Sequence, residues 1–135
     1  MSLDMYMYKH GKYRDNDEEY NELLRESARN VAYWRKANQI RQWIVDHTEM
    51  KPDDNCEFIP MTKELLEKLI EDCQMVIDNP NLAQEIMPTS SDSLFGSTAY
   101  DEWYFDDLHK TIKQIKNILE TTDFDNEMIE YTEWW

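Results

Sequence analysis

Two segments at opposite ends of the chain, residues 2–9 and residues 126–135, constrain the fold more than any other feature. In the first, apolar side chains occupy every second position: Leu3, Met5 and Met7. The second alternates with the same period over residues 128–132. Period two with aromatic content is typical of β-strands. Because a lone strand leaves its backbone groups unpaired, the two segments gain most by pairing with each other. The sequence therefore predicts a small sheet that joins the two terminal strands.

Between these strands, apolar residues recur with helical spacing. The pattern predicts helices over residues 15–30, 31–47, 62–79 and 104–120, and a short strand over residues 56–59. The second helix is inferred from a stripe formed by Tyr33, Ala37, Ile40 and Ile44, and a break is expected near Asn30 because the first two apolar phases do not match. We expect one α+β domain over residues 1–135, with about four helices packed on one face of the sheet.

The charge of the chain limits the partners it can have. The 135 residues carry a formal net charge of −15, which repels DNA, RNA and anionic membranes. The same charge also keeps a small protein in solution, and that is the simpler interpretation. Neither a signal peptide nor a membrane-spanning run is evident, so a cytosolic location with reduced cysteines is expected, with a Cys56–Cys73 bridge as the alternative. Cys56 and Cys73 show no metal-ligand spacing, and we expect neither a metal nor a cofactor.

One stretch of the chain is basic. Residues 31–42 contain three positive residues and no acidic one, which is a strong contrast in this chain. Asn is a poor residue inside a helix, so its presence here indicates a specific hydrogen bond. One interpretation is a ligand pocket that uses Trp34, Arg35, Asn38 and Arg41. The other is that Asn38 and Arg41 hold a neighbouring loop while Trp34 packs in the core.

A second stretch, residues 95–104 (FGSTAYDEWY), follows a Ser- and Thr-rich loop. It combines aromatic and polar residues that could complete the same pocket: Phe95, Ser97, Asp101, Glu102 and Trp103. Its two carboxylates could carry out acid–base chemistry, or they could have a structural role as a salt bridge to the basic residues or as a helix cap; the structural role is commoner. Ser97 has no nucleophile-elbow context, and no catalytic residue is assigned.

The C-terminal segment is both aromatic and acidic. Tyr6 and Tyr8 are expected on the same sheet, and exposed aromatic patches mark protein interfaces. We therefore assign candidate partner-binding residues at the end of the chain: Tyr131, Glu133, Trp134 and Trp135. Either this end packs back onto the fold or it contacts a partner.

The motifs of this chain resemble a family of small proteins of unknown activity from tailed bacteriophages and prophages. The resemblance rests on residues 3–6 (LDMY), 31–40 (VAYWRKANQI), 54–56, the leucine-rich helix up to Cys73, 87–89 (MPT) and 95–104. Family members often have His at the position of Arg41 and small residues before the final Trp. The resemblance implies a phage-encoded protein that acts in the bacterial cytoplasm, and it assigns no catalytic residue.

Three hypotheses follow. The first is a non-enzymatic phage accessory protein that binds a host protein, such as a nucleic-acid-handling or defence factor, through an acidic, aromatic surface. The second is a small-molecule or nucleotide-binding domain, or an enzyme, with its pocket between residues 31–41 and 95–103. The third is a homodimeric structural protein that uses the aromatic sheet as its interface.

Overall fold

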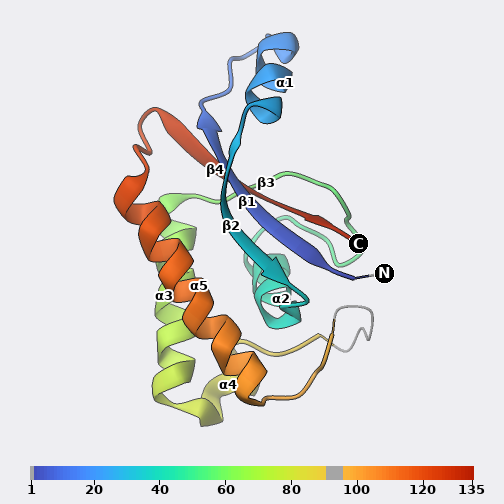
Figure 1. Cartoon of the computed structure of the whole chain (residues 1–135), viewed down its shortest axis with the longest axis vertical. Coiled ribbons are helices and arrows are strands. Elements are labelled where there is room, and N and C mark those ends of the chain that lie inside the picture. Colours follow the sequence, from blue (N-terminus) through green and yellow to red (C-terminus); the bar gives the residue numbers. More distant parts are fainter. Residues whose placement is uncertain (1, 91–95) are drawn as a thin grey trace.

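A computed structural model describes residues 2–90 and 96–135 and shows an α+β fold (Figure 1). Its four-stranded antiparallel sheet has the order β2-β1-β4-β3. The strands are β1 (Asp4–Gly11), β2 (Arg29–Arg35), β3 (Ile59–Pro60) and β4 (Glu127–Trp134). The two terminal strands are neighbours along their full length, from the pair Asp4 and Trp134 to the pair Gly11 and Glu127. The predicted pairing of the two ends of the chain is confirmed.

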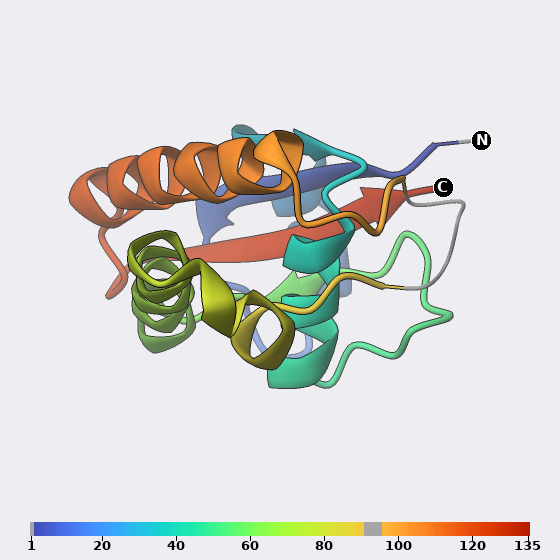
Figure 2. The ribbon, with the colours of Figure 1, turned by 90° about the horizontal axis from the view of Figure 1, so that it is seen from below.

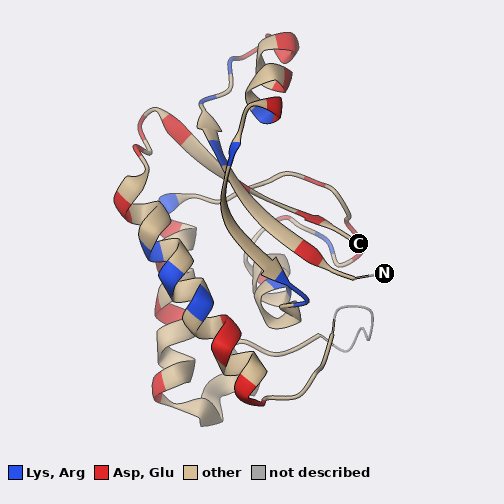
Figure 3. Ribbon diagram, in the orientation of Figure 1, with Lys and Arg blue, Asp and Glu red and all other residues tan. Residues whose placement is uncertain are grey.

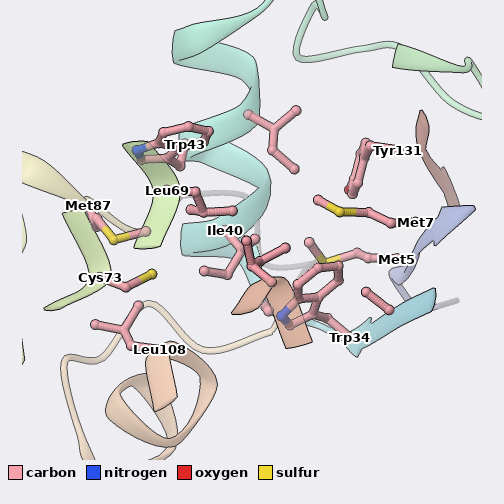
Figure 4. Close-up of a cluster of buried hydrophobic side chains, with 14 of the residues drawn as sticks. Met5, Met7, Trp34, Ile40, Trp43, Leu69, Cys73, Met87, Leu108 and Tyr131 are labelled. Atoms are coloured by element: carbon pink, nitrogen blue, oxygen red, sulfur yellow. The ribbon is translucent and has the colours of Figure 1, made fainter. Parts of the chain in front are cut away.

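The inner face of the sheet forms one wall of the hydrophobic core. Met5 and Met7 of β1 are completely buried there, as the alternation predicts. They lie with Trp34 of β2 and Tyr131 of β4 against side chains from the helices (Figure 4). The side chains at positions 6, 8 and 10 point to the opposite, outer face of β1 because successive side chains in a strand alternate.

The helices are α1 (Glu18–Glu26), α2 (Asn38–His47), α3 (Lys63–Asp78), α4 (Ala83–Ile86) and α5 (Glu102–Thr121), with a 3₁₀ turn, η1 (Pro80–Leu82), before α4. α3 and α5 lie side by side (Figure 2). Thr62 caps α3 by accepting from Leu65 N, and Leu66 and Leu69 are fully buried. Burial of each leucine stabilises the fold by about 1.5–3 kcal/mol. α1 is shorter than expected and lies beyond one end of the sheet (Figure 1).

The prediction of a helix over residues 31–47 is wrong in its first half. Residues 29–35 form strand β2, and the helix begins only at Asn38. Ala32 and Trp34 are buried on the inner face, which is a period of two. Lys36 then adopts a left-handed conformation with φ of 57°, and this turn redirects the chain into α2. The spacing from Tyr33 to Ala37 matched a helix only by coincidence.

The free edge of β2 is closed by a side chain. Tyr33 donates its backbone N–H to Oε1 of Gln114 at 2.8 Å, and Gln114 Nε2 donates to the Tyr33 carbonyl at 3.1 Å. An amide side chain thus occupies the place of a neighbouring strand. Since unpaired edges promote edge-to-edge association, Gln114 protects this strand from pairing with another chain.

Candidate functional site

A hollow of about 440 Å³ lies on the outer face of the sheet. Four aromatic side chains line it from different parts of the chain: Tyr6, Tyr8, Phe58 and Trp134. Trp134 is 67% exposed and Phe58 is 45% exposed, which is unusual for side chains of this size. We call these four residues the aromatic walls. An apolar concavity with a few converging polar groups is the usual form of a binding site, so this hollow is the first candidate site.

A hydrogen-bonded group lies at the floor of the hollow. His10 Nε2 is 2.6 Å from Oε1 of Glu130, and Tyr13 donates its hydroxyl proton to the same oxygen. Arg25 Nε in turn donates to the Tyr13 hydroxyl at 3.1 Å. Burial, followed by the contact with Glu130, raises the pKa of Tyr13 to about 12. Tyr13 is therefore a neutral donor at physiological pH, and it fixes the position of the carboxylate.

The structure separates the four predicted partner-binding residues. Tyr131 is fully buried, and Glu133 is 2% exposed although it also lines the outer-face hollow. Trp135 packs back: Asn55 donates to its carbonyl at 2.6 Å and accepts from its N–H at 3.2 Å. Trp134 alone of the four is exposed, at the mouth of the hollow. The end of the chain is thus anchored on both sides of one protruding indole.

The anchor is a buried ion pair between α2 and β4. Arg41 Nε donates to both oxygens of Glu133, at 2.9 and 2.7 Å, and its Nη2 donates to the carbonyls of Pro52 and Asp54. Glu133 also accepts from the hydroxyl of Tyr131 and from the indole N–H of Trp135, each at 2.6 Å. Burial, with the Glu133 charge as the next cause, raises the pKa of Tyr131 well above its ordinary value. Arg41 therefore serves the fold.

Trp34 and Asn38 also have structural contacts. Trp34 is fully buried and donates its indole N–H to Thr111 of α5 at 2.8 Å. Asn38 donates to the carbonyl of Ser97 at 2.8 Å and accepts from the N–H of Ser90 at 3.1 Å. These contacts match the interpretation in which Asn38 and Arg41 hold a neighbouring loop while the indole of Trp34 packs in the core.

The two predicted stretches nevertheless meet around a second hollow of about 490 Å³. Its lining includes four of the predicted residues: Arg35, Ser97, Asp101 and Trp103. Gly96, with φ of 100°, packs so closely on Lys36 that an added Cβ would lie 3.1 Å from Lys36 Cβ and its carbonyl oxygen. This contact places the loop beside the end of β2, and we call the space the loop hollow.

The predicted members of the loop hollow differ in their roles. Asp101 caps α5 by accepting from Tyr104 N at 3.2 Å, which is the commoner of its two expected roles. Ser97 Oγ accepts from Ala99 N, and Trp103 is 71% exposed. No ion pair joins Arg35 or Lys36 to the two carboxylates of this stretch in residues 2–90 and 96–135. Glu102 is exposed and does not line the hollow, and Phe95 lies outside the described residues.

Charge is unevenly distributed over the ribbon. Lys and Arg gather along α5 and at the end of β2, near the loop hollow, whereas acidic residues are spread over most elements (Figure 3). Among the described residues, no group of three or more His, Cys, Asp or Glu side chains could hold a metal ion. Within the same part of the chain, no helix has the length and apolar character needed to cross a membrane.

Sequence patterns predicted only some of the residues that line the outer-face hollow. Trp134 was identified, and the tyrosines of β1 were expected on the sheet, but His10, Glu130 and Phe58 were not singled out. A usable signal was present, because positions 6, 8 and 10 alternate with the apolar residues of β1 and positions 130, 132 and 134 do the same in β4. Phe58 reaches the hollow from the loop before β3, which no local pattern predicts.

Comparison of the chain with family models, with curated proteins and with solved structures finds no match.

Proposed function

We propose that this protein is a phage-encoded, non-enzymatic accessory protein that binds and modulates a host protein through the outer face of its sheet. The observation that carries the proposal is the hollow with its aromatic walls, two of which are exposed at its mouth. Clusters of exposed aromatic side chains are typical of protein interfaces, where Trp and Tyr contribute most of the binding energy. The resemblance of residues 31–40 and 95–104 to phage proteins supports the origin.

The charge of the chain supports a class of partner. A net charge of −15 favours association with a basic surface and disfavours nucleic acid. A host protein with a basic groove, such as a nucleic-acid-handling or defence factor, would meet both conditions. An acidic protein seated in such a groove would compete with the nucleic acid that normally binds there.

The test is affinity purification from a bacterial host lysate with two matched variants. Trp134→Ala removes an indole at the mouth of the hollow, and Trp103→Ala removes an equally exposed indole elsewhere. We expect Trp134→Ala to lower recovery of the partner by about tenfold or more, as for an interface hot spot, and Trp103→Ala to leave it unchanged. Recovery by the wild type should fall steeply as salt rises. Equal recovery by Trp134→Ala and the wild type would refute the proposal.

The loop hollow favours a second candidate function, the binding of a small molecule such as a nucleotide. Trp103 offers an exposed ring for stacking. Three basic side chains of the lining, Arg35, Lys36 and Lys110, could contact phosphate oxygens, beside an equal number of acidic ones at positions 101, 106 and 107. Thermal-shift measurements with nucleotides test this function, because a ligand that binds only the folded state raises the melting temperature. The shift should disappear in Trp103→Ala and persist in Trp134→Ala. No shift with any nucleotide at millimolar concentration would remove this candidate.

A further inference from the structure

We propose that the outer-face hollow is a receptor for one lysine side chain of the protein partner, with the ammonium group held between the aromatic walls and the Glu130 carboxylate. This inference rests on the proposed function and adds the chemistry of the group that the surface recognises. Three features of the hollow carry it: an open carboxylate oxygen, aromatic faces, and a lining in which the Arg25 guanidinium is already paired with Glu18.

The carboxylate of Glu130 is buried and held in place, and in the part of the chain that the structure describes only one of its two oxygens accepts hydrogen bonds. Its side chain is 5% exposed, and both of its hydrogen bonds, from His10 and from Tyr13, are made to Oε1. Over residues 2–90 and 96–135, no hydrogen bond is made to Oε2, although the residue lines the hollow. Oε2 is not one of the fully buried atoms that lack a partner among the described residues, so it is accessible from the hollow and can accept from a bound donor.

The aromatic walls suit a cation. Ammonium groups are attracted to the faces of Trp, Tyr and Phe, and clusters of such rings bind alkylammonium groups. Tyr6 and Tyr8 of β1 are stacked with their ring centroids 5.9 Å apart. Trp134 of β4 is paired with Asp4 of β1, two residues before Tyr6, so the three aromatic residues are close neighbours on the same face of the sheet. The long alkyl chain of lysine would pack along these rings while its charge reaches the floor.

The groups in the lining that could carry a positive charge already have partners within the protein. Both ring nitrogens of His10 are engaged: Nδ1 lies 2.7 Å from the carbonyl oxygen of Gly11, and Nε2 lies 2.6 Å from Oε1 of Glu130. The Arg25 guanidinium is paired with Glu18 at 3.1 Å. Of the two other carboxylates in the lining, Glu26 is exposed and Glu133 is paired with Arg41.

The hydrogen-bonding pattern favours lysine over arginine. Arginine binds carboxylates best through two parallel hydrogen bonds to the two oxygens, whereas lysine is a compact point charge. Oε1 of Glu130 is already occupied by two partners, so only a single-point contact at Oε2 remains. The hydroxyl of Thr132, which lines the same hollow, provides a second acceptor for the three ammonium hydrogens.

The experiment is an NMR titration of the intact chain with three capped tripeptides, acetyl-Gly-X-Gly-amide, where X is lysine, arginine or norleucine. Norleucine has a linear alkyl side chain and no charge. We expect the lysine peptide to shift the Trp134 indole resonance saturably, with a dissociation constant on the order of millimolar. Norleucine should bind about threefold to thirtyfold more weakly, and arginine more weakly than lysine. Equal binding of norleucine and lysine would overturn the cation site, and tighter binding of arginine would overturn the choice of lysine.

Two kinds of variant test the assignment. Glu130→Gln should abolish the preference for lysine over norleucine, and amide dispersion in the same spectra reports whether it folds. If it does not fold, Phe58→Ala decides the question by losing the lysine-induced shift of the Trp134 indole while Trp103→Ala retains it. Trp134→Ala removes that reporter, so its lysine binding is followed at the backbone amides of Tyr6 and Tyr8, which line the same hollow. Saturable lysine binding that survives loss of both rings would refute the proposal.

The outcomes separate this inference from the proposed function. If Trp134→Ala loses the partner from lysate but the peptides show no preference for lysine, the hollow binds its partner by other chemistry and only this inference fails. If Trp134→Ala retains the partner, the proposed function fails, and a lysine-specific shift would then identify a site for another lysine-bearing protein.

Discussion

Replacement of Arg41 by methionine should destabilise the fold severely. Arg41 and Glu133 have side chains that are 4% and 1% exposed, so the variant leaves a carboxylate buried without its counter-charge. Breaking such a pair from one side costs about 3–5 kcal/mol. For 135 residues the entropy of unfolding corresponds to a loss of about 3.5 °C per kcal/mol, which gives a fall of about 10–18 °C in melting temperature.

Urea unfolding followed by circular dichroism measures this change, with the free energy obtained by linear extrapolation. Because natural domains have only about 5–15 kcal/mol of stability, Arg41→Met can be partly unfolded. The double variant Arg41→Met/Glu133→Gln keeps the test decisive, since it removes the unpaired charge and its one amide oxygen can still accept from Tyr131 or from Trp135, which donate to different oxygens of Glu133. We expect it to be more stable than Arg41→Met alone. A loss below about 1 kcal/mol in the single variant would refute the reasoning, as would a double variant less stable than the single.

Three further predictions concern other parts of the chain. Burial raises the pKa of Asp107, so ionisation of this carboxyl group opposes folding at any pH above the ordinary pKa of aspartate. Asp107→Asn should therefore raise the melting temperature at pH 7 and leave it unchanged at pH 3. Scanning calorimetry at the two pH values measures the difference. Cys56 is exposed, whereas burial raises the pKa of the Cys73 thiol, so mass spectrometry after alkylation should show one modified cysteine in the folded protein and two in urea. Gly96→Ala should lower stability by about 1–3 kcal/mol, because the backbone is left-handed and the new Cβ meets Lys36; an unchanged urea midpoint would contradict this.

The sequence predicted best where one pattern acts alone. The alternation of Met5 and Met7 and the capped, leucine-rich α3 each have a single interpretation, and both appear in the structure. The pairing of the terminal strands was also predictable, because the sequence patterns indicated no other long strand. The pairing of β1 with β2, in contrast, depends on a strand that the helical interpretation of residues 31–47 concealed.

The error at β2 has a physical cause. A stretch of seven residues contains too few turns to separate a period of 3.6 from a period of 2, and Tyr33 and Ala37 satisfied the first by chance. The turn that divides strand from helix is made by Lys36 in a left-handed conformation, for which glycine or asparagine would have been the usual signal.

The candidate sites were predicted in part for similar reasons. The prediction that Asn38 makes a specific hydrogen bond is confirmed. The bond goes to the carbonyl of Ser97 and so holds the loop before α5. The outer-face hollow combines β1, β4 and the loop that carries Phe58, and such a combination depends on tertiary structure. Exposure of Trp134 beside the anchored Trp135 could not be inferred from two identical neighbouring residues.

The central claim is that the outer face of the sheet, around Phe58 and Trp134, contacts a host protein. Site-specific photocrosslinking inside a bacterial host tests it most directly, with a benzophenone side chain placed at position 58 or, as a control, at position 75, where Met75 is 38% exposed compared with 45% for Phe58. We predict a discrete adduct with a host protein from position 58 and none from position 75. Adducts of equal yield from both positions, or only a homodimer from position 58, would contradict the account.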